Sequence, residues 1–169
     1  SHNQGVEILA RAVGEQLPGE GTPREKFLAK MNEHCTTAGF VGASFDNPAG
    51  ASLNCLISPN DLASLTLTTF GIASIRAIFA NTTCAVQVRG PNARVLSSAK
   101  SILEFGMDNF PDHQASKSGS WSGEAAFTLL LRTEHNAGLG VAVIMGSTTA
   151  RRYYDLRTIV NAAKDKYNS

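Results

Sequence analysis

The stretch Leu139-Gly140-Val141-Ala142-Val143-Ile144-Met145 constrains the fold of this chain more than any other feature of its sequence. No polar side chain interrupts it, whereas a strand with one face in water alternates apolar and polar residues. A short, continuous apolar run predicts a strand that is buried on both faces, in the middle of a sheet. Such a strand needs a neighbour along each edge, because a long apolar edge promotes aggregation.

One neighbour is apparent in the sequence. Phe127–Leu131 reads as a strand, and Asn136-Ala137-Gly138 supplies the turn between the two. We therefore expect at least one further pairing strand to lie outside the sequence shown. A closing helix is predicted for Thr149–Lys166. Its sheet-facing side is predicted to comprise Tyr153, Leu156, Ile159, Val160 and Ala163.

The first half of the chain shows helical patterns. A first helix is predicted, with Val6, Leu9, Val13 and Leu17 on one face. Thr22-Pro23-Arg24-Glu25 has the composition of a capping box and opens a second helix, and Ser58-Pro59-Asn60-Asp61 caps a third. Residues 1–80 are thus predicted to be mainly helical.

Residues 81–169 are predicted to hold strands and the closing helix. Cys84–Val88 and Arg94–Leu96 form a hairpin around the turn at Gly90-Pro91-Asn92. The fold class is therefore α+β, with an antiparallel sheet packed against helices.

Composition excludes several classes of function. The formal net charge of +1 provides no basic field for nucleic acid. No apolar run approaches the roughly 18 residues of a membrane span, so any membrane association is expected only through segments not present here. Three cysteines without a CxxC pair, and four scattered histidines, predict no metal site and no cofactor. We expect the thiols to be buried, with a single disulfide as the alternative, and the histidines to be surface or capping residues.

Lys117-Ser118-Gly119 is the sharpest chemical signal, and it precedes Ser120 and Trp121. A lysine and a small hydroxyl residue on one strand can bind a carboxylate, and the glycine lets a ligand backbone lie close. A solvated edge strand is the alternative reading of this short pattern, and Trp121 is expected to have a packing role. Glu124, after this strand, is expected to be a solvated strand end.

The pattern S-x-N occurs three times, at Ser1-His2-Asn3, Ser52-Leu53-Asn54 and Ser58-Pro59-Asn60. The third is explained as a helix cap. Spacing alone does not choose between the other two.

Taken in order, several segments resemble the serine D-alanyl-D-alanine carboxypeptidases of the penicillin-binding protein and β-lactamase superfamily. Ser1-His2-Asn3 is similar to the S-x-N motif of these enzymes, and Lys117-Ser118-Gly119 to their K-[TS]-G motif. The other segments that carry the resemblance are EKFLAKMNEHCTTAGF, ASFDNPAG, SPNDLASL, VQVRGPNARV, ILEFGMDNFPDHQASKSGSW and GLGVAVIMGSTTARRYYDLRTIVNAA. The resemblance covers nearly the whole chain in the family's order and implies a β-lactamase/DD-peptidase-like fold, incomplete at the N-terminus, with residues 1–169 as its C-terminal portion.

The resemblance also implies roles for individual residues. Ser1, Asn3 and Lys117 would be catalytic: Ser1 would relay a proton, Asn3 would hold the acyl-side amide, and Lys117 would bond to Ser1. The substrate-binding residues would be Ser118, Gly119 and Ser120, with the Ser120 N–H as an oxyanion donor. The substrate would be the peptidoglycan stem peptide, β-lactam antibiotics would be inhibitors, and the site would lie in the bacterial cell envelope.

The nucleophile expected of this family is missing from its place. The S-x-x-K serine should precede S-x-N, but the one S-x-x-K here, Ser97-Ser98-Ala99-Lys100, follows it and is expected to start a surface helical turn. We therefore expect the nucleophile in a preceding segment of the same protein, and expect the chain to be inactive alone. Three alternatives stay open: a muropeptide-binding relative without a nucleophile, a class A β-lactamase-like enzyme, and a hydrolase that uses Ser1 as an N-terminal nucleophile.

Overall fold

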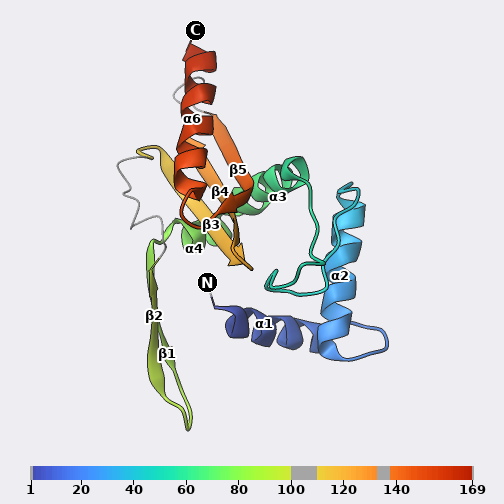
Figure 1. Cartoon of the computed structure of the whole chain (residues 1–169). Coiled ribbons are helices and arrows are strands. Elements are labelled where there is room, and N and C mark those ends of the chain that lie inside the picture. The colour runs from blue at the N-terminus through green and yellow to red at the C-terminus, as the bar shows by residue number, and fades with distance from the viewer. Residues whose placement is uncertain (1, 100–109, 133–137, 169) are drawn as a thin grey trace. The chain divides into compact units, whose positions relative to one another are not determined.

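A computed structural model describes residues 2–99, 110–132 and 138–168, with only the backbone for residues 96, 98, 99, 125–132, 167 and 168. The chain forms two compact units, Ser1–Asp61 and Leu62–Ser169, hereafter the N-terminal and C-terminal units. Each unit is described by itself below (Figure 1).

Two helices form most of the N-terminal unit. Helix α1 (Asn3–Gln16) is followed by α2 (Pro23–Thr37), which begins with the predicted capping box: the Thr22 hydroxyl accepts from the Glu25 N–H, and the Glu25 carboxylate accepts from the Thr22 N–H. The Thr22 hydrogen bonds lower the pKa of Glu25.

The apolar face predicted for α1 is not the face that the structure buries most deeply. Leu9 and Val13 are exposed, and the buried residues are Ala10 and Gly14. A Cβ atom at Gly14 would lie 1.8 Å from the carbonyl oxygen of Pro23, so the contact with α2 requires the absence of a side chain there. The small residues set the contact face because they allow the backbones to approach closely.

Hydrogen bonds of polar side chains hold the loop that follows α2. The Asn32 amide donates to the carbonyls of Leu28 and Phe45 and accepts from the Phe45 N–H. Asp46 then accepts hydrogen bonds from Ser52, Asn54 and Cys55. These bonds close the loop against itself, and an isolated bridge pairs Ser44 with Leu56.

Helix α3 (Pro59–Gly71) starts where predicted, with the Ser58 hydroxyl accepting from the Asp61 N–H. The chain then bends by 104° at Ile72 into α4 (Ala73–Ala80). In the described part of the chain no single helix has the length and hydropathy of a membrane span, although α3 and α4 together pass the same test.

The predicted hairpin is confirmed. Strand β1 (Thr83–Val88) pairs antiparallel with β2 (Arg94–Ala99). The prediction that Ser97 starts a helical turn is wrong, because Ser97–Ala99 belong to β2, where backbone pairing with β1 overrides the local pattern. Lys100 lies outside the described residues.

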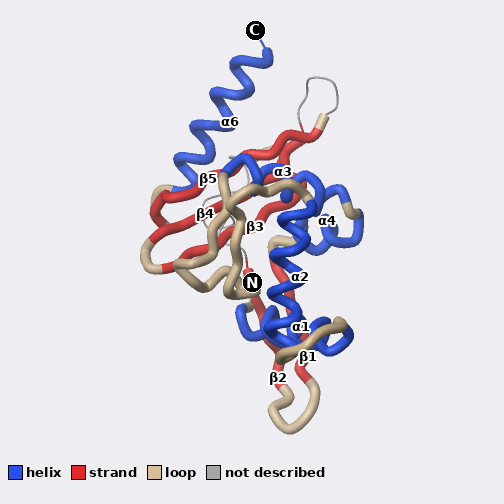
Figure 2. Tube along the Cα trace, turned by 90° about the vertical axis from the view of Figure 1, so that its right-hand side faces the viewer, coloured by secondary structure: helices blue, strands red, loops and turns tan. Residues whose placement is uncertain are grey.

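The described main sheet contains β3 (His113–Trp121), β4 (Glu124–Arg132) and β5 (Leu139–Thr148), in that order and antiparallel. Helix α6 (Arg152–Asn168) covers one face, and α3 and α4 lie on the other (Figures 1 and 2). The predicted turn at residues 136–138 lies largely outside the described residues.

Strand β5 is apolar on both faces because both faces are covered. Ala142 and Ile144 belong to a buried cluster with Phe110 and, from α6, Tyr153, Leu156 and Val160. Val141 packs on the other side, against the cluster of Phe70 and Ala115. Within the described sheet β5 pairs only with β4, so the expectation of a further strand stays a prediction.

Two predictions of burial need correction. Ile159 and Ala163 of α6 are exposed although Tyr153, Leu156 and Val160 are buried, because the sheet covers a narrower side of the helix than the pattern suggested. Of the cysteines, Cys35 is buried, and burial raises the pKa of its thiol. Cys55 is half-buried and Cys84 exposed, since the hairpin that carries Cys84 has little cover.

Candidate functional site

Strand β3 carries Lys117, Ser118 and Gly119, which the sequence predicted to lie on a strand, and β3 is at one edge of the described sheet. A two-residue turn at Ser122 and Gly123 joins it to β4, and both turn residues have positive φ, 50° and 87°. That conformation is the type I′ turn of a tight hairpin, in which the flanking pair Trp121–Glu124 is hydrogen-bonded. The direction of backbone groups along β3 follows from this pair.

Backbone groups of alternate residues point to opposite edges of a strand. Since Trp121 bonds to β4, so do Gly119 and Lys117. Ser118 and Ser120 therefore present their N–H and C=O groups at the other edge of β3, which pairs with no strand among the described residues. An extended peptide could add there through main-chain hydrogen bonds.

Lys117 lies across this edge. Its ammonium donates to the carbonyl of Ser118. Burial, and secondarily the nearby charge of Arg152, hold the pKa of Lys117 below its usual range. An anion bound beside Lys117 would counter both effects.

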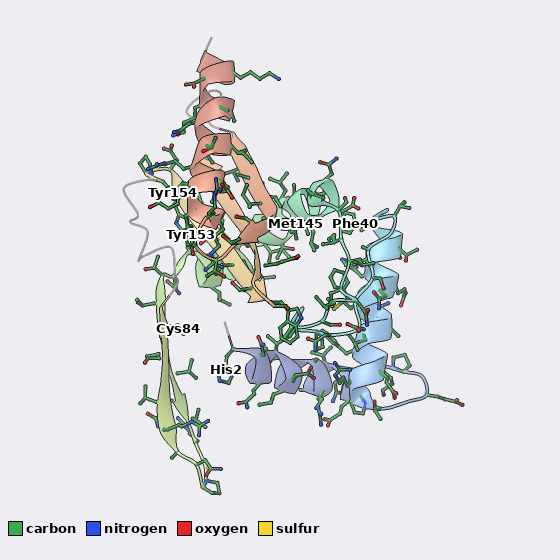
Figure 3. The ribbon with its side chains drawn as sticks, in the orientation of Figure 1. His2, Phe40, Cys84, Met145, Tyr153 and Tyr154 are labelled. Carbon is green, nitrogen blue, oxygen red and sulfur yellow. The ribbon has the colours of Figure 1, made fainter. Side chains whose placement is uncertain are left out.

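Arg152 is the site residue that sequence reasoning missed. It opens α6 and is buried, yet its guanidinium donates to the Ser120 hydroxyl (2.9 Å) and to the Gly119 carbonyl (3.4 Å). It also lies over the ring of Tyr153, with 4.9 Å from Cζ to the ring centroid. Tyr153 and Tyr154, labelled in Figure 3, come from the same helical turn. The sequence feature that could have identified Arg152 is its charge at the start of a helix whose next residues form an apolar face.

A second polar pair supports β3 from within. Ser116 is fully buried, and its hydroxyl lies 3.0 Å from Nε2 of His113. His113, which was expected to be a surface or capping residue, is half-buried and supplies the hydrogen-bond partner that the buried Ser116 hydroxyl requires. His2 and His34 are exposed, as expected, and His135 lies outside the described residues.

Ser1-His2-Asn3 belongs to the N-terminal unit. Ser1 lies outside the described residues, and Asn3 is the first residue of α1. His2 is the N-cap, and its Nδ1 accepts from the Gly5 N–H at 3.3 Å (Figure 3). Helix-capping geometry therefore explains the local structure of this motif, and the roles of Ser1 and Asn3 stay predictions.

The remaining S-x-N motifs have structural roles. The Ser52 and Asn54 side chains both bond to the carboxylate of Asp46, and Ser58 caps α3. Across the described ranges, no three His, Cys, Asp or Glu side chains are grouped so that they could hold a metal ion.

Solved structures of a bacterial enzyme share this arrangement of elements. The crystal structure of the Streptomyces K15 DD-transpeptidase matches with a TM-score of 0.73 at 16% sequence identity, over 90% of this chain. Two single-residue mutants of that enzyme match with TM-scores of 0.70 and 0.72, each at 17% identity. The fold is that of a DD-transpeptidase.

The predicted α+β fold is confirmed by this likeness. The chain spans 60% of the length of the K15 structure. No known family model matches the sequence. No curated protein matches it either.

Proposed function

We propose that this chain forms the carboxylate-binding part of a serine DD-peptidase site, which removes the terminal D-Ala from peptidoglycan stem peptides in the bacterial cell envelope. The observation that carries the proposal is the pair of cations at β3: Lys117, with its lowered pKa, and Arg152, bonded to Ser120. Two positive charges, near enough that Arg152 lowers the pKa of Lys117, favour an anionic peptide end beside β3. A C-terminal carboxylate is such an end, and arginine binds carboxylates through two parallel hydrogen bonds.

The peptide would lie along the edge of β3 that points away from β4. Its carboxylate would be near Lys117, Ser118 and Arg152, and its scissile carbonyl near the Ser120 N–H. That N–H points outward and can donate to the oxyanion of a tetrahedral intermediate.

The acyl-transfer step requires a serine that this chain does not supply in the expected place. In the proposed reaction, an S-x-x-K serine from a segment outside this sequence loses its proton to a base and attacks the carbonyl between the two D-Ala residues. The amide C–N bond breaks, the leaving nitrogen takes up a proton, and D-Ala departs. Water then hydrolyses the acyl-enzyme, and a penicillin would acylate the same serine.

The binding step is testable on the chain as it is. We expect calorimetry to detect binding of acetyl-L-Lys-D-Ala-D-Ala, and expect Arg152→Ala to weaken it by about tenfold or more, the value of one charge-assisted contact. The matched control is Arg151→Ala, because Arg151 is adjacent but exposed and pairs only loosely with Asp155 (3.8 Å). Equal affinities in the two variants would exclude the proposed carboxylate site.

The chemical step needs a longer polypeptide that contains S-x-x-K before Ser1. We expect such a polypeptide to be labelled covalently by a fluorescent penicillin, and Lys117→Ala to abolish the labelling. Binding of the tripeptide without labelling would instead favour the muropeptide-binding alternative. Rapid release of the hydrolysed penicillin would favour the β-lactamase alternative.

A further inference from the structure

Strand β3 contains one residue more than its pairing with β4 uses. From the turn back to Ala115, which lies opposite Leu130, the register is regular, but His113 lies opposite Leu131. Gln114 is therefore the extra residue of a β-bulge. A bulge interrupts the alternation of side chains between the two faces of a strand, so its position matters for every residue between it and the next fixed point.

The C-terminal end of this stretch is fixed by the backbone. The two-residue turn sets Trp121 opposite Glu124. The packing role expected for Trp121 is wrong, because its side chain is 47% exposed, whereas Glu124 is exposed as expected. The geometry of the turn, and not the burial of side chains, therefore fixes the register at this end.

The N-terminal end is attached to α6. Phe110 belongs to the buried cluster that α6 forms with the sheet. The carboxylate of Asp112 pairs with the ammonium group of Lys164 at 2.6 Å. Between these two fixed ends the strand has to accommodate its extra residue, and neither end determines where it does so.

The position of the extra residue determines the face on which Lys117 lies. With the extra residue before Lys117, as observed, regular alternation back from the turn puts Lys117 on the face of Ala115, which packs with Phe70 of α3. With the extra residue between Lys117 and Trp121, the lysine would lie on the opposite face of the sheet. The site on β3 therefore depends on a bulge that stays on the N-terminal side of the lysine.

The hydrogen bond between His113 and Ser116 specifies the observed position. In an unbroken strand, residues three positions apart lie on opposite faces, so these two side chains can meet only if the extra residue lies between them. They do meet, since the Ser116 hydroxyl lies 3.0 Å from Nε2 of His113. Ser116 is fully buried, so moving the bulge beyond Lys117 would cost the free energy of a lost buried hydrogen bond.

We propose that His113 is a positioning residue for the site on β3. Its hydrogen bond to Ser116 keeps the extra residue of the strand before Lys117, and so keeps Lys117 and Ser118 on the faces that form the site. His113 acts through Ser116 and not on the substrate. The inference rests on the proposed function for what the site binds, whereas the position of the bulge is measurable without a ligand.

Hydrogen exchange of single amides, measured by NMR on the whole chain, reports where the extra residue lies. The N–H groups of Lys117 and Gly119 both point to β4, so both should be protected. A bulge that moves beyond Lys117 turns its N–H away from β4. We expect His113→Ala to lower the protection of Lys117 relative to Gly119 by about two- to tenfold, the range of one hydrogen bond. A general loss of stability would lower both protections equally and leave their ratio unchanged.

Two further variants separate the hydrogen bond from the volume of the imidazole ring. His113→Gln should retain the ratio, because the terminal nitrogen of glutamine lies as many bonds from Cα as Nε2 of histidine. Ser116→Ala removes the hydroxyl and leaves a methyl group at a buried position, so the chain should fold while the ratio falls. His34→Ala, at an exposed histidine, is the control and should leave the ratio unchanged.

Calorimetry with acetyl-L-Lys-D-Ala-D-Ala relates the bulge to binding. His113→Ala and Ser116→Ala should each weaken binding by about two- to tenfold, and His113→Gln should bind like the unaltered chain. An exchange ratio or a peptide affinity that is unchanged in both of the weakened variants would overturn the positioning role and leave the proposed function intact. If the unaltered chain does not bind the peptide, the proposed function is overturned, and the exchange ratio still decides whether His113 sets the bulge.

Discussion

The two units of this chain are stabilised in different ways. In the C-terminal unit large apolar side chains are buried, including Phe70, Phe110, Ile144 and Leu156. In the N-terminal unit the buried apolar residues described are the small Ala10 and Cys35. Polar contacts hold that unit instead: the capping box of α2, the Asn32 amide, the Asp46 cluster, and an ion pair between Arg24 and Glu7 at 3.1 Å.

The charged clusters of the two units differ as well. The carboxylate of Asp46 accepts hydrogen bonds from neutral donors of its own loop, which lower its pKa and satisfy its charge. Lys117 is held near a second cation instead, and its pKa is lowered because its charged form is disfavoured. The first cluster stabilises a loop, whereas the second concentrates positive charge, which we propose attracts an anionic ligand.

The largest effect is expected from the apolar core of the C-terminal unit. Leu156 is fully buried, so Leu156→Ala should lower the free energy of unfolding by about 2–5 kcal/mol. Ile159→Ala on the exposed side of α6 is the control and should cost less than about 1 kcal/mol. Urea unfolding followed by Trp121 fluorescence reports on this unit, and equal losses in the two variants would contradict the assignment of the core.

In the N-terminal unit the backbone contact of α1 with α2 should be the most sensitive point. Gly14→Ala would place a Cβ atom against the Pro23 carbonyl and should destabilise this unit by about 1–3 kcal/mol. Gly5→Ala is the matched control in the same helix, because its Cβ would meet only ordinary contacts and alanine favours a helix. Hydrogen exchange over residues 2–61 measures the effect. Protection that is unchanged in Gly14→Ala would show that α1 does not depend on this contact.

Peptide binding should depend on pH through Lys117. The ammonium group of Lys117 can bind the peptide carboxylate only while it carries its charge. The affinity for acetyl-L-Lys-D-Ala-D-Ala should therefore fall as pH rises through the lowered pKa of Lys117, at a lower pH than an ordinary lysine would titrate. The peptide's own lysine titrates only in the ordinary range of a lysine side chain, above the pH range of this fall. Lys117→Arg should abolish the fall, because arginine keeps its charge at all accessible pH values. A fall of equal size in that variant would exclude Lys117 as its source.

The smallest effect is expected at Asp46. Because its pKa is lower in the folded chain than in the unfolded chain, its stabilising contribution is present above the ordinary pKa of aspartate, roughly pH 4. The contribution is lost as pH falls further, through the lowered pKa of the folded state. Asp46→Asn should therefore make the stability of the N-terminal unit less dependent on pH in this range, as measured by hydrogen exchange. If the Asp46→Asn variant keeps the same acid dependence of stability, other carboxylates are the source of that dependence.

Local rules predicted most of the elements correctly. The capping box at Thr22, the cap at Ser58, the β1–β2 hairpin and the apolar β5 strand were all apparent from residues a few positions apart. The errors lie where the outcome depends on contacts distant in the sequence. Leu9 and Val13 fit a helical face, but the close approach of Pro23 selected the small residues of α1 instead. Ile159 fits the pattern of α6, but the sheet does not cover it.

The candidate site shows the same division. The sequence by itself determined that Lys117, Ser118 and Gly119 lie together on a strand, because strand preferences act over a few residues. Only the tertiary structure brought the Arg152 guanidinium to the Ser120 hydroxyl, 32 residues away, and placed Glu124 opposite an exposed Trp121. The physical reason is that helix docking and strand register are decided by burial of the whole apolar surface, which no local pattern contains.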